Sequence, residues 1–172
     1  ILGTHHLAPV SFADSIHGVK AALDNTVQVC GELDMADMMN PEKLMSMQKA
    51  MMLEDGKTLS SLLDEKQMSK LNSLLNIVMG ADMTNPMVKM QLEKITPSAL
   101  VTQLTMIMSM KRCPDFDMTN QFDGYFQKLA QKNGKGVKGF ETMEFQIATL
   151  LKGATMERQI EQLMCLCDNY EY

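Results

Sequence analysis

Several segments of the chain begin with a helix N-cap residue followed by proline at the first helical position. They are Asn40-Pro41, Asn85-Pro86 and Thr96-Pro97. An Asn or Thr side chain can accept the free N–H groups of a first turn, and proline lacks the N–H that would be left over there. Asp64 offers a fourth start, with Gln67 placed to close a capping box and Gly80 placed to end the helix. These signals predict an all-helical insertion over about 41–112.

Outside this segment, short stretches have the pattern of strands. Apolar and polar residues alternate over 27–33, and 136–140 is too short for a helix. The apolar opening of the chain leads into Gly3, and we interpret residues 1–6 as the end of a third strand. A helical pattern over 11–23 lies between residues 1–6 and 27–33, as in a crossover between two parallel strands. We therefore expect 1–6, 27–33 and 136–140 to form one sheet.

The remaining periodic segments are helical, over about 120–133, 142–152 and 155–169. Together these elements predict a mixed α/β (α+β) fold, with a small, mostly parallel sheet and the large helical insertion. At 172 residues the chain is predicted to form one domain over 1–172. Because the first predicted strand is already under way at residue 1 without a starting methionine, we expect the chain to be an interior piece of a longer polypeptide.

Charge and composition narrow the classes of partner. The chain has 16 Lys+Arg against 21 Asp+Glu and no basic run, which argues against a nucleic-acid partner. No apolar stretch approaches the roughly 20 residues of a membrane-spanning helix. The four cysteines have no CxxC spacing and are expected to be buried free thiols, with a disulfide or metal role as the alternative. Oligomeric state has no signal in the sequence.

Methionine is unusually frequent, with 19 residues in a chain that has no tryptophan. The first interpretation is that Met replaces Leu as a flexible core filler, which predicts that most of Met79, Met90, Met106 and Met110 are buried. A second interpretation is an adaptable apolar groove lined by Met, and a third is a thioether site for Cu(I). The copper interpretation is the weakest, because no Met cluster has a His or Cys beside it in sequence.

Polar residues gather where the predicted strands end. His5 and His6 end the first, Glu32 and Asp34 the second, and Glu141 the third. Parallel strands bring such ends to one edge of the sheet. An imidazole with carboxylates there can bind a divalent metal or perform acid–base chemistry.

Each of these ends follows a glycine, namely Gly3, Gly31 and Gly139, which permits close approach of backbone or ligand. Neighbouring strand residues point to opposite faces, so His5 and His6 cannot both enter one site without a turn. A structural histidine and solvated carboxylates are the alternative interpretation of the same residues. Asp123 begins an amphipathic helix and is either a further candidate or a charge that favours the helix dipole.

Four motifs in order resemble the TraB/GumN family, which includes the Tiki proteases that clip Wnt proteins and is similar to the erythromycin-esterase/ChaN-like group. The motifs are Leu2-Gly3-Thr4-His5-His6, Glu32-Leu33-Asp34, Phe122-Asp123-Gly124-Tyr125-Phe126 and the block from Gly139 to Gln146. The family pattern GxxH falls on Gly3 and His6, its acidic strand end on Glu32, and its Glu-Thr/Gln block on Glu141 and Gln146. His5 stands where the pattern usually has an apolar residue.

The resemblance implies a metal-dependent hydrolase, with a peptide or protein as substrate, acting in the periplasm, outside the cell or at its surface. A divalent ion (Mn, Co or Zn) held by His6, Glu32 and a further histidine would activate water and polarise a carbonyl. Glu141 would orient a ligand or transfer a proton. The family carries a second GxxH motif downstream, and the chain reaches Tyr172 without one. The resemblance therefore predicts weak metal binding by this chain and tight binding by a longer one.

A function of a different class is also compatible with the sequence. In this alternative the chain is a non-catalytic binding module, whose Met-rich helices form an apolar groove for a peptide or another hydrophobic ligand. A second GxxH motif beyond Tyr172 would favour the enzyme.

Overall fold

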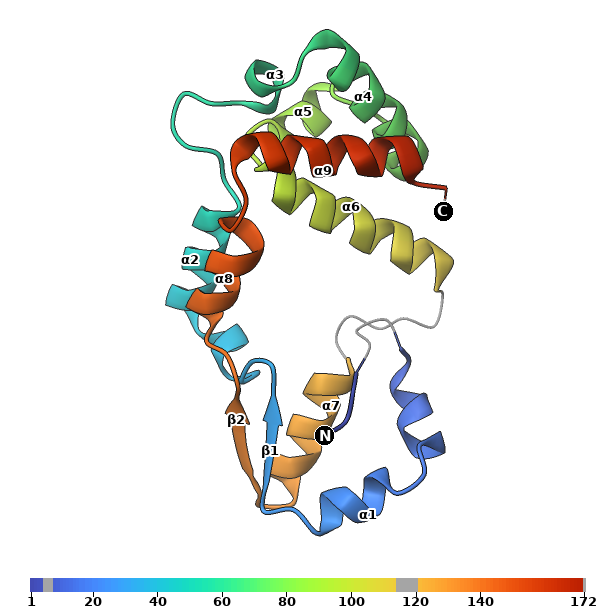
Figure 1. Ribbon diagram of the computed structural model, residues 1–172, viewed down its shortest axis with the longest axis vertical. Coiled ribbons are helices and arrows are strands. Elements are labelled where there is room, and N and C mark those ends of the chain that lie inside the picture. The colour runs from blue at the N-terminus through green and yellow to red at the C-terminus, as the bar shows by residue number, and fades with distance from the viewer. Residues whose placement is uncertain (5–7, 114–120, 172) are drawn as a thin grey trace. The chain divides into compact units, whose positions relative to one another are not determined.

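The computed structural model describes residues 1–4, 8–113 and 121–171, which divide into two compact units (Figure 1). The first unit comprises Ile1–Leu44 and Ser109–Phe145, and the second comprises Met45–Met108 and Gln146–Tyr172. Each unit has its own packing and is described separately.

The first unit is built on a small parallel sheet. Strands β1 (Gln28–Gly31) and β2 (Gly136–Gly139) pair in parallel, from Gln28 opposite Gly136 to Gly31 opposite Gly139. Helix α7 (Phe122–Lys132) packs against both strands. The short helices η1 (Val10–Ser15), α1 (Val19–Asp24) and η2 (Asp37–Met39) complete the unit. The predicted α/β class with a small parallel sheet is therefore confirmed.

The start of the chain differs from the prediction. Ile1–Thr4 form no strand, and residues 5 and 6 lie outside the described residues. Instead of joining a ladder, Thr4 donates its hydroxyl hydrogen to Asp123 Oδ1 on α7, at 3.0 Å. An apolar pattern makes a strand only where a neighbouring edge accepts its backbone hydrogen bonds, and the pattern alone does not supply that edge.

The predicted helix over 11–23 is two helices. Gly18 has a φ of +82° between η1 and α1. This left-handed conformation is accessible to glycine and interrupts the helical ladder, although the apolar spacing continues across it.

The helical insertion is confirmed. Its helices are α2 (Pro41–Ala50), α3 (Leu59–Leu62), α4 (Glu65–Met79), α5 (Pro86–Leu92) and α6 (Pro97–Arg112). The only strand-like pairing described within it is a single antiparallel bridge between Met52 and Ile95.

The helix starts follow the predicted chemistry. Asp64 Oδ1 accepts from the Gln67 N–H at 2.8 Å, and Gln67 Oε1 accepts from the Asp64 N–H at 3.0 Å. Asn40 Oδ1 and Asn85 Oδ1 each accept a first-turn N–H at 2.9 Å. Gly80 ends α4 with a φ of +78°. A cap of this kind stabilises a helix by about 1 kcal/mol.

The second unit contains the main hydrophobic core. Helix α4 packs against α9 (Met156–Asn169), and α8 (Met143–Leu151) precedes α9 in the chain. The fully buried leucines of this core are Leu59, Leu71, Leu74, Leu75, Leu100, Leu104 and Leu163. Each contributes roughly 1.5–3 kcal/mol through burial. Among the described residues, no helix combines the length and apolar character needed to cross a membrane.

The four methionines that test the core-filler prediction are not buried in this core. Met79, Met90 and Met110 are exposed, and Met106 is half-buried, so the prediction is wrong for these four. Leucine and valine occupy the buried positions instead, as Val88 and Leu92 do on α5. The four cysteines are free, as expected, but only Cys167 is buried.

Candidate functional site

The two parallel strands bring Glu32 and Glu141 to the same end of the sheet. Beyond the last strand pair, the Phe140 N–H donates to the Gly31 carbonyl oxygen at 2.9 Å. The Glu141 N–H then donates to the Glu32 carbonyl oxygen, also at 2.9 Å. Glu32 and Glu141 are both exposed. The backbones of these two candidate residues, 109 positions apart in the chain, are thus directly bonded to each other.

The glycines before these residues are required by close packing of the protein itself. A Cβ added at Gly139 would lie 2.6 Å from the Asp34 backbone nitrogen. A Cβ at Gly31 would overlap the side-chain amide of Gln127. Gly3, by contrast, has no such neighbour within 4 Å. The expected close approach therefore occurs at two of the three glycines. Backbone atoms approach Gly139, and the Gln127 side chain approaches Gly31.

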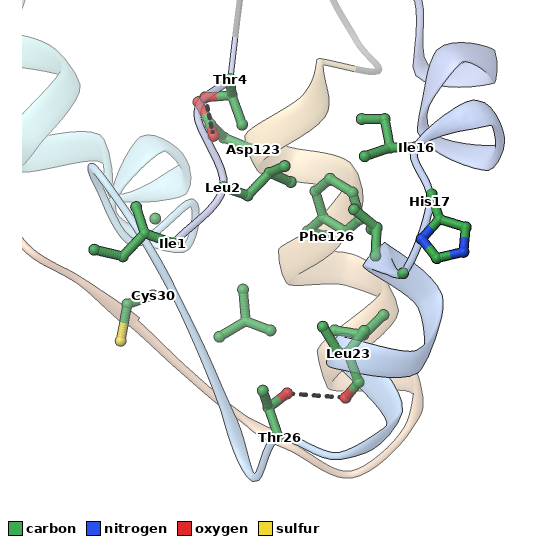
Figure 2. A pocket seen from close by; sticks show the side chains of 15 residues that line it. Ile1, Leu2, Thr4, Ile16, His17, Leu23, Thr26, Cys30, Asp123 and Phe126 are labelled. Carbon is green, nitrogen blue, oxygen red and sulfur yellow. Dashed lines mark hydrogen bonds between the residues drawn. The ribbon is translucent and has the colours of Figure 1, made fainter.

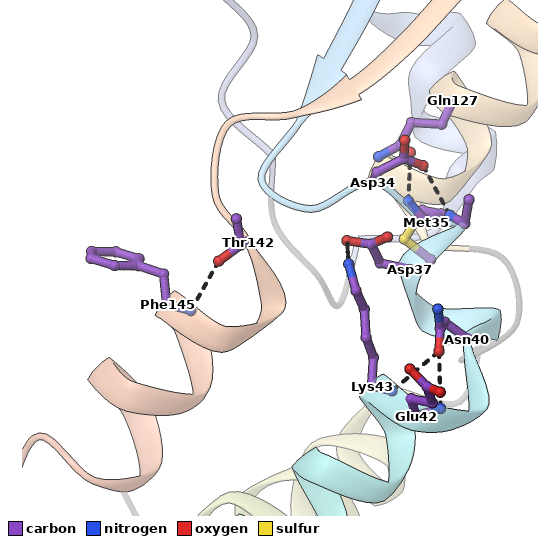
Figure 3. A network of polar contacts seen from close by, with 10 residues as sticks. Asp34, Met35, Asp37, Asn40, Glu42, Lys43, Gln127, Thr142 and Phe145 are labelled. Atoms are coloured by element: carbon purple, nitrogen blue, oxygen red, sulfur yellow. Dashed lines mark hydrogen bonds and ion pairs between the residues drawn. The ribbon is translucent and has the colours of Figure 1, made fainter.

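Gln127 holds the segment that leaves β1. It lies on α7 and is only 2% exposed. Its Nε2 donates to the Leu33 carbonyl oxygen at 2.8 Å. Its Oε1 accepts from the Met35 N–H at 2.9 Å, a bond that Figure 3 shows. Gln127 was not among the residues predicted from the sequence. The signal that could have identified it is a polar residue on the apolar face of an amphipathic helix, among Phe122, Gly124 and Ala130.

Asp34 has a local structural role. Its Oδ1 accepts from the Ala36 N–H at 2.9 Å, and its carbonyl oxygen accepts from the Asp37 N–H at the same distance. These bonds form the turn that leads into η2. At least one carboxylate oxygen of Asp34 is therefore engaged in the turn.

A charged group lies just beyond this turn. Lys43 Nζ is 2.6 Å from Asp37 Oδ2, with both side chains partly exposed (Figure 3). The hydrogen bond to Asp37 raises the pKa of Lys43, and the charges of Asp37, Glu144 and Asp34 raise it further. Acidic side chains thus surround this lysine near the carboxyl ends of the strands.

Asp123 borders a pocket on the first unit. The pocket has a volume of about 480 Å³, and its wall includes Leu2, Ile16, Val29 and Phe126. Figure 2 shows Thr4 and Asp123 hydrogen-bonded on one side of it, with His17 on another. His17 is exposed. The pocket is mainly apolar and does not include Glu32 or Glu141.

The remaining candidate residues are His5, His6 and Gln146. His5 and His6 lie outside the described residues. Gln146 is half-buried on α8 and belongs to the second unit. Within residues 1–4, 8–113 and 121–171, no three His, Cys, Asp or Glu residues form a group that could hold a metal ion.

Comparison with known proteins identifies the family. The family model of the TraB/PrgY/gumN family matches residues 1–172. No curated protein and no solved structure matches the chain. The match covers every motif at the strand ends and the helical insertion between them. The chain belongs to the TraB/PrgY/gumN family.

Proposed function

We propose that the chain carries part of the reaction centre of a metal-dependent hydrolase that cleaves peptides or proteins outside the cytoplasm. The centre lies where β1 and β2 end, with His6 and Glu32 as protein ligands of a divalent ion and Glu141 beside them. The observation that carries the proposal is the Glu141 N–H bond to the Glu32 carbonyl oxygen, in a member of this family.

The geometry supports this location in two ways. The carboxyl ends of parallel strands are where open α/β sheets bind their ligands. The segment after β1 is also fixed, by Gln127 and by the tight approach at Gly139. Residues placed on a fixed segment can keep a defined separation, which a binding or catalytic centre requires.

The described residues alone do not make a complete metal site. Protein sites for zinc usually supply three or four ligands, and no group of three is present in the described parts of the chain. The proposal therefore depends on His6, and we derive no reaction step through the metal. The chain bends after Gly31 and Gly139, so strand alternation no longer sets the directions of the two glutamate side chains.

The contribution of Glu141 can be stated separately from that of the metal ligands. When the oxygen of water bonds to the carbonyl carbon of a peptide, a carboxylate can take up the proton that water releases. The same proton can then pass to the leaving amine as the C–N bond breaks. A positioned general acid–base group of this kind accelerates a reaction by about 10²–10⁴-fold.

Cleavage of a peptide mixture tests the proposal. The chain is incubated with the mixture and Mn²⁺, Co²⁺ or Zn²⁺, and new peptide termini are counted by mass spectrometry. Glu32→Gln and Glu141→Gln should each lower the cleavage rate by about 10²-fold or more. Glu161→Gln is the matched control, since Glu161 is exposed on α9, where it forms an ion pair with Arg158. Equal cleavage by the wild type and Glu32→Gln would contradict the proposed centre.

A binding function has one specific observation in its favour. The second unit has a groove of about 460 Å³ lined by Met45, Met51, Met52 and Ile95, with Gln48, Lys49 and Gln103 as its polar residues. Unbranched methionine side chains adapt to varied apolar partners. We propose, as the second candidate, that this methionine groove binds an apolar peptide without cleaving it.

The two candidates predict different results. In the binding candidate, a fluorescent apolar peptide binds the chain, and Met45→Lys weakens binding because it places a charge in the groove. Met87→Lys, at an exposed methionine outside the groove, should bind as the wild type does. Equal binding by Met45→Lys and Met87→Lys would exclude the methionine groove.

A further inference from the structure

We propose that Gln127 is a positioning residue of the strand-end centre. Its buried side-chain amide fixes the segment Glu32–Met35 and so sets where Glu32 lies relative to Glu141. This inference rests on the proposed function for its significance, but its structural content can be tested independently.

Both polar atoms of the Gln127 side chain are used. Nε2 donates to the Leu33 carbonyl oxygen at 2.8 Å, and Oε1 accepts from the Met35 N–H at 2.9 Å. The side chain is nearly inaccessible to water. Loss of the amide would therefore leave two backbone groups without their partner, and water is poorly placed to replace it.

The two bonds act on either side of Asp34. Leu33 follows Glu32 directly, and Met35 begins the turn toward η2. The bonds therefore anchor the chain just after the Glu32 carbonyl, which accepts from the Glu141 N–H. Because α7 packs against both β1 and β2, the anchor is a helix that contacts both strands.

The pair of bonds requires glutamine rather than a similar side chain. A glutamate at this position could accept from Met35 but could not donate to Leu33 when ionised. A leucine could do neither. Gly31 is part of the arrangement, since a Cβ there would overlap the Gln127 amide.

Amide hydrogen exchange measured residue by residue by NMR tests this role. Gln127→Leu removes both bonds and should speed exchange of the Met35 and Glu141 amides by about 10-fold or more. The Gly136 amide, bonded to the Val27 carbonyl oxygen at the opposite end of the strands, should keep its wild-type rate. Gln131→Leu, an exposed position on the same helix, is the matched control and should change none of them.

Gln127→Glu separates the two bonds and also serves if Gln127→Leu does not fold. Its carboxylate keeps the acceptor for Met35, whose exchange should stay close to the wild-type rate. It loses the donor to Leu33, so exchange at Glu141 should still increase. An unchanged Glu141 rate in Gln127→Glu, or an equal increase at Gly136, would overturn the positioning role.

A Mn²⁺ titration of the same variants links the role to the centre. If the wild type binds the ion, Gln127→Leu should bind it about 10-fold more weakly, as loss of an outer-shell partner does at other metal sites. Equal binding by the two would overturn the inference. If the wild type binds no Mn²⁺, the proposed metal site fails, and the exchange rates alone decide the role of Gln127.

Discussion

Gly31 and Gln127 are packed so closely that a methyl group on Gly31 would overlap the Gln127 side-chain amide. The glycine on β1 and the glutamine on α7 are therefore a matched pair. The pair lies next to the residues proposed to carry the chemistry, because Glu32 follows Gly31 directly.

Gly31→Ala should destabilise the first unit by about 1–3 kcal/mol, the usual cost of overpacking a filled site. Adding Gln127→Ala should recover part of that loss by making space, so the two effects should not add. The free energy of unfolding, measured in urea for both single variants and the double variant, gives the coupling. Gly3→Ala is the control, since a methyl group on Gly3 would meet nothing within 4 Å. Strict additivity of Gly31→Ala and Gln127→Ala would show that they are not a pair.

The capping box of α4 should make a measurable contribution to the stability of the second unit. Asp64→Ala removes the acceptor for the Gln67 N–H and should lower the free energy of unfolding by about 1 kcal/mol. Asp55→Ala, at an exposed position outside the helices, should change it by less than about 0.5 kcal/mol. Urea titration of the two variants measures the difference, and equal stability would mean that the box contributes nothing.

The exposed methionines should tolerate polar replacement. Met90 is 70% exposed, whereas Leu74 is fully buried. Met90→Gln should therefore change the stability by less than about 0.5 kcal/mol, while Leu74→Ala should cost about 2–5 kcal/mol. Thermal unfolding compares the two variants. A loss of stability above about 2 kcal/mol for Met90→Gln would indicate that Met90 is buried in the core, against this prediction.

Cys167 should make the stability depend on pH in the alkaline range. Burial raises the pKa of its thiol to about 11, with a smaller increase from the charge of Asp168. In the unfolded chain a thiol ionises near pH 8.5, so the unfolded state releases its proton first. The stabilisation is complete below that pH and is lost as the pH rises toward 11. Denaturant titrations at about pH 8 and 10.5 should show a loss of roughly 2 kcal/mol that is absent in Cys167→Ala. The same loss in both proteins would assign it to other groups.

Local signals in the sequence predicted the helices well. An N-cap residue with proline, or the pair Asp64 and Gln67, acts within one turn, so its effect does not depend on distant packing. The positions of β1 and β2 were also predictable from alternation and glycine, although β1 ends at Gly31, two residues before the predicted end.

Features that depend on distant partners could not be predicted. Ile1–Thr4 have an apolar pattern, but they join no strand, and Thr4 bonds to Asp123 instead. A polar residue on the apolar face of α7 is a signal for Gln127 in the sequence, but its partners Leu33 and Met35 follow only from the packing of that helix. The helical spacing of the methionines did not show which side of α5 is buried. The structure buries Val88 and Leu92 on that helix.

Calorimetric titration with Mn²⁺ or Zn²⁺ tests the proposed centre most directly. We predict weak binding of one ion by the wild-type chain. Loss of one direct ligand should weaken binding by at least about 10-fold in His6→Ala and in Glu32→Gln, with Glu161→Gln unchanged. Glu32→Gln keeps the backbone carbonyl oxygen of residue 32, so the backbone bond from the Glu141 N–H remains available. The variant therefore measures the effect of the side-chain carboxylate alone. Equal affinity of the wild type, His6→Ala and Glu32→Gln for the ion would contradict a metal centre at the end of β1 and β2.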